Sequence, residues 1–191
     1  TTYFNKEEYI LYSLPIVTNF ASKTKRVEYF VGTDGKEYNL ETGAVRSNES
    51  IEISAVSSLK RTKKKIYEYA FANDTALSTF QMTSGDAKTM GNYVFDGDKE
   101  LENVKISSTV SEIGLRPFKG CTKLKEVDFA GSPYFTCKNS IIYKLSNGSE
   151  TELVQCLEAR GNSSGSSTVN KNEVPATLTT IYEEAFMDCA N

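Results

Sequence analysis

A motif that returns every 23 or 24 residues is the feature that most limits how this chain folds. In each copy an aromatic residue precedes an apolar one by six positions, and the pairs are Phe71 and Leu77, Phe95 and Leu101, and Phe118 and Leu124. The second half of each copy then alternates apolar and polar residues, which is the period of a β-strand. With so short a period, each strand lies beside the equivalent strand of the next repeat. The sequence therefore predicts a parallel ladder of the segments 77–82, 101–106 and 124–129.

A longer similarity links the two halves of the chain. Residues 29–43 recur at an offset of 105 residues as 134–148, with aromatic, leucine and glycine positions in register. The hexapeptide 66–71 recurs as 181–186 at an offset of 115, and the Gly/Ser-rich stretch 160–168 accommodates the extra ten residues. A larger unit therefore begins again in the second half.

Several segments outside the repeats have local signatures. Segments 27–31 and 36–40 flank a Gly-rich turn, as do 140–145 and 151–157, so both pairs are predicted to be hairpins. Asn5 and Glu8 have the spacing of a capping box, which predicts a short helix over 6–13.

The absence of histidine narrows the chemistry open to this chain. Among its 191 residues none can serve in a Ser-His-Asp or Cys-His centre or a histidine zinc site. Carboxylate, lysine and all-cysteine sites remain open. A net charge of −3 gives no general attraction to nucleic acid, and no 18-residue apolar run predicts a membrane-spanning segment. We therefore expect no enzyme, no cofactor and no metal.

The four cysteines do not form a Cys-x-x-Cys pair. Cys121 and Cys189 share one repeat position three repeats apart, about 14 Å at strand spacing, so both are predicted to be buried free thiols. Cys137 and Cys156 flank the second hairpin, and the sequence leaves open whether they are bridged.

Two charged clusters have a functional and an ordinary interpretation. The basic run 60–65 carries five positive charges, which suits either a polyanion site or a solvated loop, and the acidic balance elsewhere favours the loop. The acidic run 96–100 lacks the spacing of a calcium loop and is predicted to be a solvated turn.

The polar positions between the apolar strand residues are the candidate contact surface. Side chains alternate across a strand, so these residues should stand side by side on the exposed face of the ladder, where repeat proteins usually bind. The candidate binding residues are Thr79, Gln81, Asn103, Lys105, Glu126 and Asp128.

The repeat resembles the BspA-like leucine-rich repeat family, also called the LRR_5 type. Residues 109–127 and 174–189 match the family pattern I-x-x-x-A-F-x-x-C-x-x-L-x-x-V best. Val94 and Pro117 stand where alanine is usual, and Asp74 and Asp98 stand where cysteine is usual. The resemblance implies a leucine-rich-repeat solenoid, a right-handed β/α superhelix of mainly short parallel strands with hairpin interruptions and little helix. The expected organisation is an N-terminal cap or flank over 1–26 and repeats over 27–191, interrupted at about 27–50 and 132–173.

The resemblance also implies secretion or anchoring at a cell surface and adhesion to host or matrix. We expect a non-catalytic adhesion or ligand-binding module, with a protein or glycan as partner. A structural spacer and a secreted carboxylate-based hydrolase are the alternatives. The sequence starts without signal-peptide features, and its last copy lacks a strand. We therefore expect a piece of a longer protein, with further repeats or a partner chain at the C-terminal end.

Overall fold

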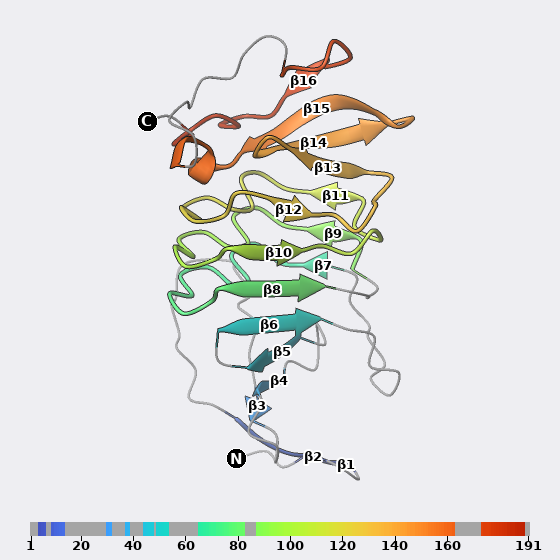
Figure 1. Ribbon diagram of the computed structural model, residues 1–191. Helices are drawn as coiled ribbons and strands as arrows, with labels where there is room; N and C mark the ends of the chain where they lie inside the picture. Colours follow the sequence, from blue (N-terminus) through green and yellow to red (C-terminus); the bar gives the residue numbers. More distant parts are fainter. Residues whose placement is uncertain are drawn as a thin grey trace.

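The computed structural model describes residues 4–6, 9–13, 30–31, 37–38, 44–47, 49–53, 65–82, 87–162 and 173–189. These residues form a stack of short strands with β1 (Phe4–Lys6) at one end and β16 (Thr180–Ile181) at the other (Figure 1). One short 3-10 helix, η1 (Glu158–Asn162), is the helical segment among the described residues. The fold is thus a leucine-rich-repeat solenoid with almost no helix, as predicted.

The predicted ladder is present and parallel. It consists of β6 (Ser50–Ile53), β8 (Thr79–Met82), β10 (Asn103–Lys105) and β12 (Val127–Asp128). Phe80 lies opposite Val104, and Val104 lies opposite Val127. The three strands expected from the repeat period therefore stand in register in one sheet.

A second ladder runs along the other side of the coil. Strands β7 (Lys65–Ile66), β9 (Thr89–Met90) and β11 (Glu112–Ile113) pair in parallel, with Ile66, Met90 and Ile113 aligned and buried (Figure 1). Each repeat thus contributes one short strand to each sheet, and the apolar residues of both sheets face one common core.

The turns between the two sheets are also bonded from repeat to repeat. The amides of Phe71 and Phe95 donate to carbonyls of the following turn, Val94 O at 2.9 Å and Pro117 O at 2.8 Å. Each turn has two positions with positive φ, four residues apart. The first set is Tyr69, Tyr93, Arg116 and Glu184, and the second is Asn73, Gly97, Gly120 and Asp188. Three of the second set are Gly or Asn, the residues that adopt this conformation most readily.

The repeated phenylalanine fills the core between the sheets. The rings of Phe71 and Phe95 stack with centroids 5.3 Å apart, and Phe95 stacks on Phe118 at the same distance. Phe80 adds an edge contact to Phe95 at 4.8 Å. Offset and edge-to-face contacts are favourable aromatic geometries, so this column joins each repeat to the next. The predicted interior position is confirmed for Phe71, Phe95 and Phe118.

Antiparallel strands are present at both places where the turn signals predict hairpins. Near the N-terminal end, β2 (Tyr9–Ser13), β3 (Phe30–Val31), β4 (Glu37–Tyr38) and β5 (Ala44–Ser47) form an antiparallel extension that leads into β6. In the second half, β13 (Phe135–Lys138), β14 (Ile141–Ser146) and β15 (Ser149–Cys156) are antiparallel, and β15 pairs in parallel with β16. Asn147 and Gly148, both with positive φ, make the β14–β15 turn that the sequence predicts.

The helix predicted over 6–13 is wrong. Residues 4–6 are β1 and residues 9–13 are β2, and the two pair in antiparallel register. The segment Tyr9-Ile10-Leu11-Tyr12 is rich in aromatic and β-branched residues, which favour strands, and pairing with β3 outweighs a capping signal that is only local.

The cysteine prediction is wrong for Cys189. Cys189 is bridged to Cys156, with Cα atoms 5.9 Å apart, whereas Cys121 is free and buried as predicted. The inserted hairpin places the end of β15 beside the last repeat, where the Cys156 amide donates to Ala185 O at 2.7 Å. Cys137 is free, because β14 lies between β13 and β15 and separates Cys137 from Cys156 by two strand spacings, about 10 Å.

Candidate functional site

The structure brings the predicted contact residues together on one face. Asn103 lies opposite Thr79, Lys105 lies opposite Gln81, and Asp128 lies opposite Lys105. Glu126 directly precedes β12. We call these six residues the exposed ladder; their role in binding stays a prediction.

Strand alternation explains why this face is polar. Phe80, Val104 and Val127 point inward and are buried, while the residues on either side of each point outward. Gln81, Asn103, Glu126 and Asp128 are exposed, and Thr79 and Lys105 are half-buried.

Part of the exposed ladder is paired internally. Lys105 Nζ lies 3.2 Å from Asp128 Oδ2, and the Ala130 amide donates to Asp128 Oδ1 at 2.7 Å. The Ala130 amide and, secondarily, Lys105 lower the pKa of Asp128. Among the described residues, the side chains of Gln81, Asn103 and Glu126 make no hydrogen bond or ion pair. These three groups therefore have their hydrogen-bonding capacity available for a ligand.

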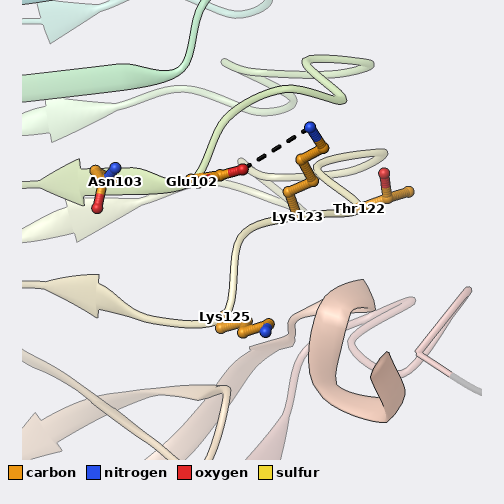
Figure 2. A pocket seen from close by; sticks show the side chains of 5 residues that line it. All are labelled: Glu102, Asn103, Thr122, Lys123 and Lys125. Atoms are coloured by element: carbon orange, nitrogen blue, oxygen red, sulfur yellow. Dashed lines mark ion pairs between the residues drawn. The ribbon is translucent and has the colours of Figure 1, made fainter. Parts of the chain in front are cut away.

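A hollow of about 410 Å³ lies at one end of the exposed ladder, where the chain enters β10 and β12 (Figure 2). It is lined by Glu102, Asn103, Thr122, Lys123 and Lys125. Of these, only Asn103 was predicted as a contact residue. The other four precede the alternating part of the strand, so the strand period does not single them out.

The lysines of the hollow differ in their pairing. Lys123 Nζ lies 2.6 Å from Glu100 Oε2 and 3.8 Å from Glu102 Oε1, and the bond to Glu100 raises the pKa of Lys123. Lys125 is exposed and forms no ion pair with any residue that the structure describes. Within the part of the chain that the structure describes, the hollow thus holds one paired ammonium group, on Lys123, and one unpaired ammonium group, on Lys125.

The two free thiols are not reactive candidates. Burial raises the pKa of Cys137 to about 11 and raises that of Cys121 well above its usual value. A thiol must ionise to act as a nucleophile or metal ligand, so both side chains serve packing. Within the described ranges, no group of three Cys, Asp or Glu side chains has the arrangement to hold a metal ion.

The acidic run at 96–100 is not simply a solvated turn, because Asp98 is fully buried. Its Oδ1 accepts a bond from the Asp74 amide at 2.7 Å, and its Oδ2 has no hydrogen-bond partner among the described residues. Desolvation raises the pKa of Asp98 to about 8, so the group is largely protonated at neutral pH. Asp98 occupies the repeat position of Cys121, which accounts for its burial.

A buried arginine that the sequence did not single out joins the last two units. The Arg116 side chain is 1% exposed, and its guanidinium donates to Glu158 at 3.0 Å, to Asp188 at 2.8 Å and to Met187 O at 3.0 Å. Glu158 also accepts from the Gly120 amide at 2.8 Å. The cluster links the third repeat, η1 and the last repeat. We interpret it as structural.

Two sequence features fall outside these surfaces. The basic run 60–65 lies outside the described residues except for Lys65, which belongs to β7. In the part of the chain that the structure describes, no helix has the length and apolar character needed to cross a membrane.

Comparison with known proteins identifies the repeat. The family profile described as "BspA type Leucine rich repeat region" matches residues 64–191 in six copies. A search of curated proteins gave no significant match. Among solved structures, the pneumococcal vaccine antigen PcpA is similar over 97% of this chain, with 9% identity and a TM-score of 0.40. The chain spans 62% of the length of that PcpA chain.

Proposed function

The chain belongs to the BspA-type leucine-rich repeat family, and from that premise we propose that it is a non-catalytic ligand-binding module displayed outside the cell. The observation that carries the proposal is the exposed ladder. Three neighbouring strands present side chains in register, and Gln81, Asn103 and Glu126 have no partner among the described residues. Repeat solenoids commonly bind through such open sheet faces.

A protein is the favoured partner of this face. The exposed ladder and the hollow mix amides, carboxylates and ammonium groups over a short distance, and no sign of charge prevails. A partner with charges of both signs matches such a surface better than a uniformly charged glycan. The predicted targets are therefore proteins of a host surface or matrix, with a glycan as the second candidate.

The Cys156–Cys189 disulfide supports an extracellular location. Structural disulfides persist in oxidising compartments and are rare in the cytosol of most organisms. Peptide mapping of the protein purified from its natural compartment tests this. A 156–189 linked peptide is expected under non-reducing conditions, and two free thiols at these positions would contradict it.

The chain's composition supports the absence of catalysis. It contains no histidine, and both free thiols have raised pKa values, which removes the usual nucleophile and base pairs. A spacer that holds another domain is the second candidate function. It is favoured by the regular stacking, which gives length irrespective of the surface residues.

A second contact is proposed at the C-terminal end of the stack. Ile181 is 55% exposed, Phe186 is 40% exposed and Met187 is 50% exposed. Ile66 and Phe71, which hold the repeat positions of Ile181 and Phe186, are buried. Another repeat or a partner chain would cover these apolar groups in the same way.

A binding screen separates the binding module from the spacer. The purified chain is screened against a panel of extracellular-matrix proteins and a glycan array, together with the triple variant Gln81→Ala, Asn103→Ala and Glu126→Ala. We expect saturable binding to a matrix protein that the triple variant weakens at least about tenfold, the effect of one or two lost contacts.

The matched control is Glu112→Ala, which removes an exposed carboxylate from β11 on the opposite sheet. This variant should bind as well as the unaltered chain. Binding that survives the triple variant, or no saturable binding to any member of the panel, contradicts the proposal and favours the spacer.

A further inference from the structure

The hollow forms because β10 and β12 are not hydrogen-bonded to each other at their amino-terminal ends. Strand β10 starts at Asn103, opposite Thr79, whereas β12 starts only at Val127, opposite Val104. The Ser78 carbonyl accepts amide bonds from Glu102 at 3.0 Å and Asn103 at 3.1 Å. At the next step, no equivalent bond to the Glu102 carbonyl is found within the described residues. The two segments therefore separate between residues 102 and 125, and Figure 2 shows the lining side chains on either side of this gap.

The donors of the hollow are not fully used within the chain. Lys123 turns back to Glu100 and Glu102, as Figure 2 shows for Glu102. The Lys125 ammonium and the Asn103 amide have no partner among the described residues. A carboxylate has two acceptor oxygens, so one can accept from an ammonium group while the other accepts from an amide.

The surroundings of the hollow limit how much negative charge it can receive. Glu102 lines it, and Glu126 and Asp128 lie beside it on the exposed ladder. Several negative groups on one ligand would face these carboxylates, whereas a single carboxylate would face mainly Lys125. This arrangement disfavours sulfated or otherwise polyanionic glycans and fits an isolated acidic side chain.

We propose that the hollow receives one aspartate or glutamate side chain of a protein partner, held by the Lys125 ammonium and the Asn103 side-chain amide. The inference rests on the proposed function, because it assigns a specific contact to a surface proposed to bind protein. It also gives a role to Lys125, which has no ion-pair partner among the described residues, whereas Lys123 pairs with Glu100 and Glu102.

The test uses defined probes in place of the unknown partner. The ¹⁵N-labelled chain is titrated by NMR with the tripeptide acetyl-Gly-Glu-Gly-amide and with its neutral counterpart acetyl-Gly-Gln-Gly-amide. We expect the glutamate peptide to shift the Asn103 side-chain amide and the backbone amides of residues 122–126, with an affinity in roughly the millimolar range. The glutamine peptide should bind about fivefold more weakly, because it lacks the charge.

Lys125→Gln is the diagnostic variant, since it keeps the length of the side chain and removes the charge. It should lower the affinity for the glutamate peptide to that for the glutamine peptide. Lys88→Gln is the matched control, because Lys88 is also exposed and precedes β9 on the opposite sheet. Scattered shifts, equal binding of both peptides, an equal effect of both variants, or tighter binding of a sulfated heparin disaccharide at the same residues would each overturn the proposal.

This experiment is independent of the matrix-protein screen. If the peptide titration fails while the triple variant still loses binding to a matrix protein, only the assignment of the hollow is wrong. If the screen finds no binding but the glutamate peptide docks in the hollow, the proposed function fails and the subsite remains.

Discussion

At the scale of single residues, one position of the repeat is occupied by side chains of different chemical type. The third residue after each phenylalanine is Asp74, Asp98, Cys121 or Cys189. The Cys121 thiol donates to Phe95 O at 3.2 Å, and Asp74 is half-buried and paired with Arg46. Asp98 is fully buried and pairs directly with no cation of the described residues, so the fold favours its protonated form.

Asp98→Asn should therefore change how stability depends on pH. The pKa of Asp98 is raised from 3.8 to about 8 in the folded state, so the folded protein binds a proton that the unfolded chain has released. The stabilisation is fully present below pH 3.8 and is lost as the pH rises through 8. The neutral amide avoids this loss, so the variant should be the more stable protein at pH 9, by on the order of 2 kcal/mol.

Urea denaturation from pH 4 to pH 9 measures this difference. The gap between variant and unaltered chain should open with rising pH. Asp96→Asn, at a partly exposed neighbour, serves as the control for a general charge effect. Parallel curves for Asp98→Asn and the unaltered chain would mean that Asp98 is ionised in the folded state.

Arg116 is a second informative single residue, because its buried guanidinium forms ion pairs with Glu158 of η1 and Asp188 of the last repeat. Arg116→Met keeps the aliphatic volume but leaves the largely buried Glu158 without its cation. Loss of one partner of a buried ion pair is strongly destabilising, so we expect a loss of about 3 kcal/mol in the free energy of unfolding. Lys123→Met, which breaks an exposed pair, should leave the urea midpoint almost unchanged. Equal effects of the two variants would show that the Arg116 cluster adds little.

At the scale of elements, the repeat unit was largely predictable and the inserted units were predictable only in part. The spacing of Phe71, Phe95 and Phe118 predicted both the parallel strands and the column of buried rings. This is because equivalent residues of successive repeats have equivalent surroundings in a stack. The hairpins were recognisable from their turns. Their contacts were not, because the approach of Cys156 to Cys189 depends on where the hairpin docks and no local pattern encodes that position.

Phe95→Ala tests the ring column. Phe95 is fully buried between Phe71 and Phe118, so its removal leaves a cavity and should lower the free energy of unfolding by about 3–5 kcal/mol. Phe186 holds the same repeat position but is 40% exposed, so Phe186→Ala should lower it by less than about 1 kcal/mol. Chemical denaturation of both variants gives the comparison, and similar losses would contradict the stacking of repeats described above.

At the scale of the whole molecule, the sequence predicted the solenoid and the position of the exposed ladder. It missed the antiparallel extension at β1 and β2, because a capping signal cannot reveal a distant pairing partner. It missed four of the five residues of the hollow, because the gap arises from a one-residue difference in where β10 and β12 start. Such differences in where a strand starts depend on packing between repeats and cannot be seen in the periodic pattern of the sequence.

The exposed apolar end of the stack leads to a prediction about the whole molecule. One additional repeat, a copy of residues 101–123 joined after Asn191, should cover Ile181 and Phe186 and raise the thermal midpoint, because each interface in a solenoid stabilises both neighbours. A Gly/Ser tail of equal length is the control and should leave the midpoint unchanged. An unaltered midpoint with the added repeat would mean that this end is not a repeat interface.

Both the solenoid and the proposed binding surface depend on the parallel register of β8, β10 and β12. Inter-strand nuclear Overhauser effects in the labelled protein test this register. We expect contacts from the backbone of Val104 to the backbone near Phe80 on one side and near Val127 on the other, in the pattern of parallel strands. Contacts in an antiparallel pattern, or contacts to only one of these strands, would contradict the ladder and with it the proposed binding surface.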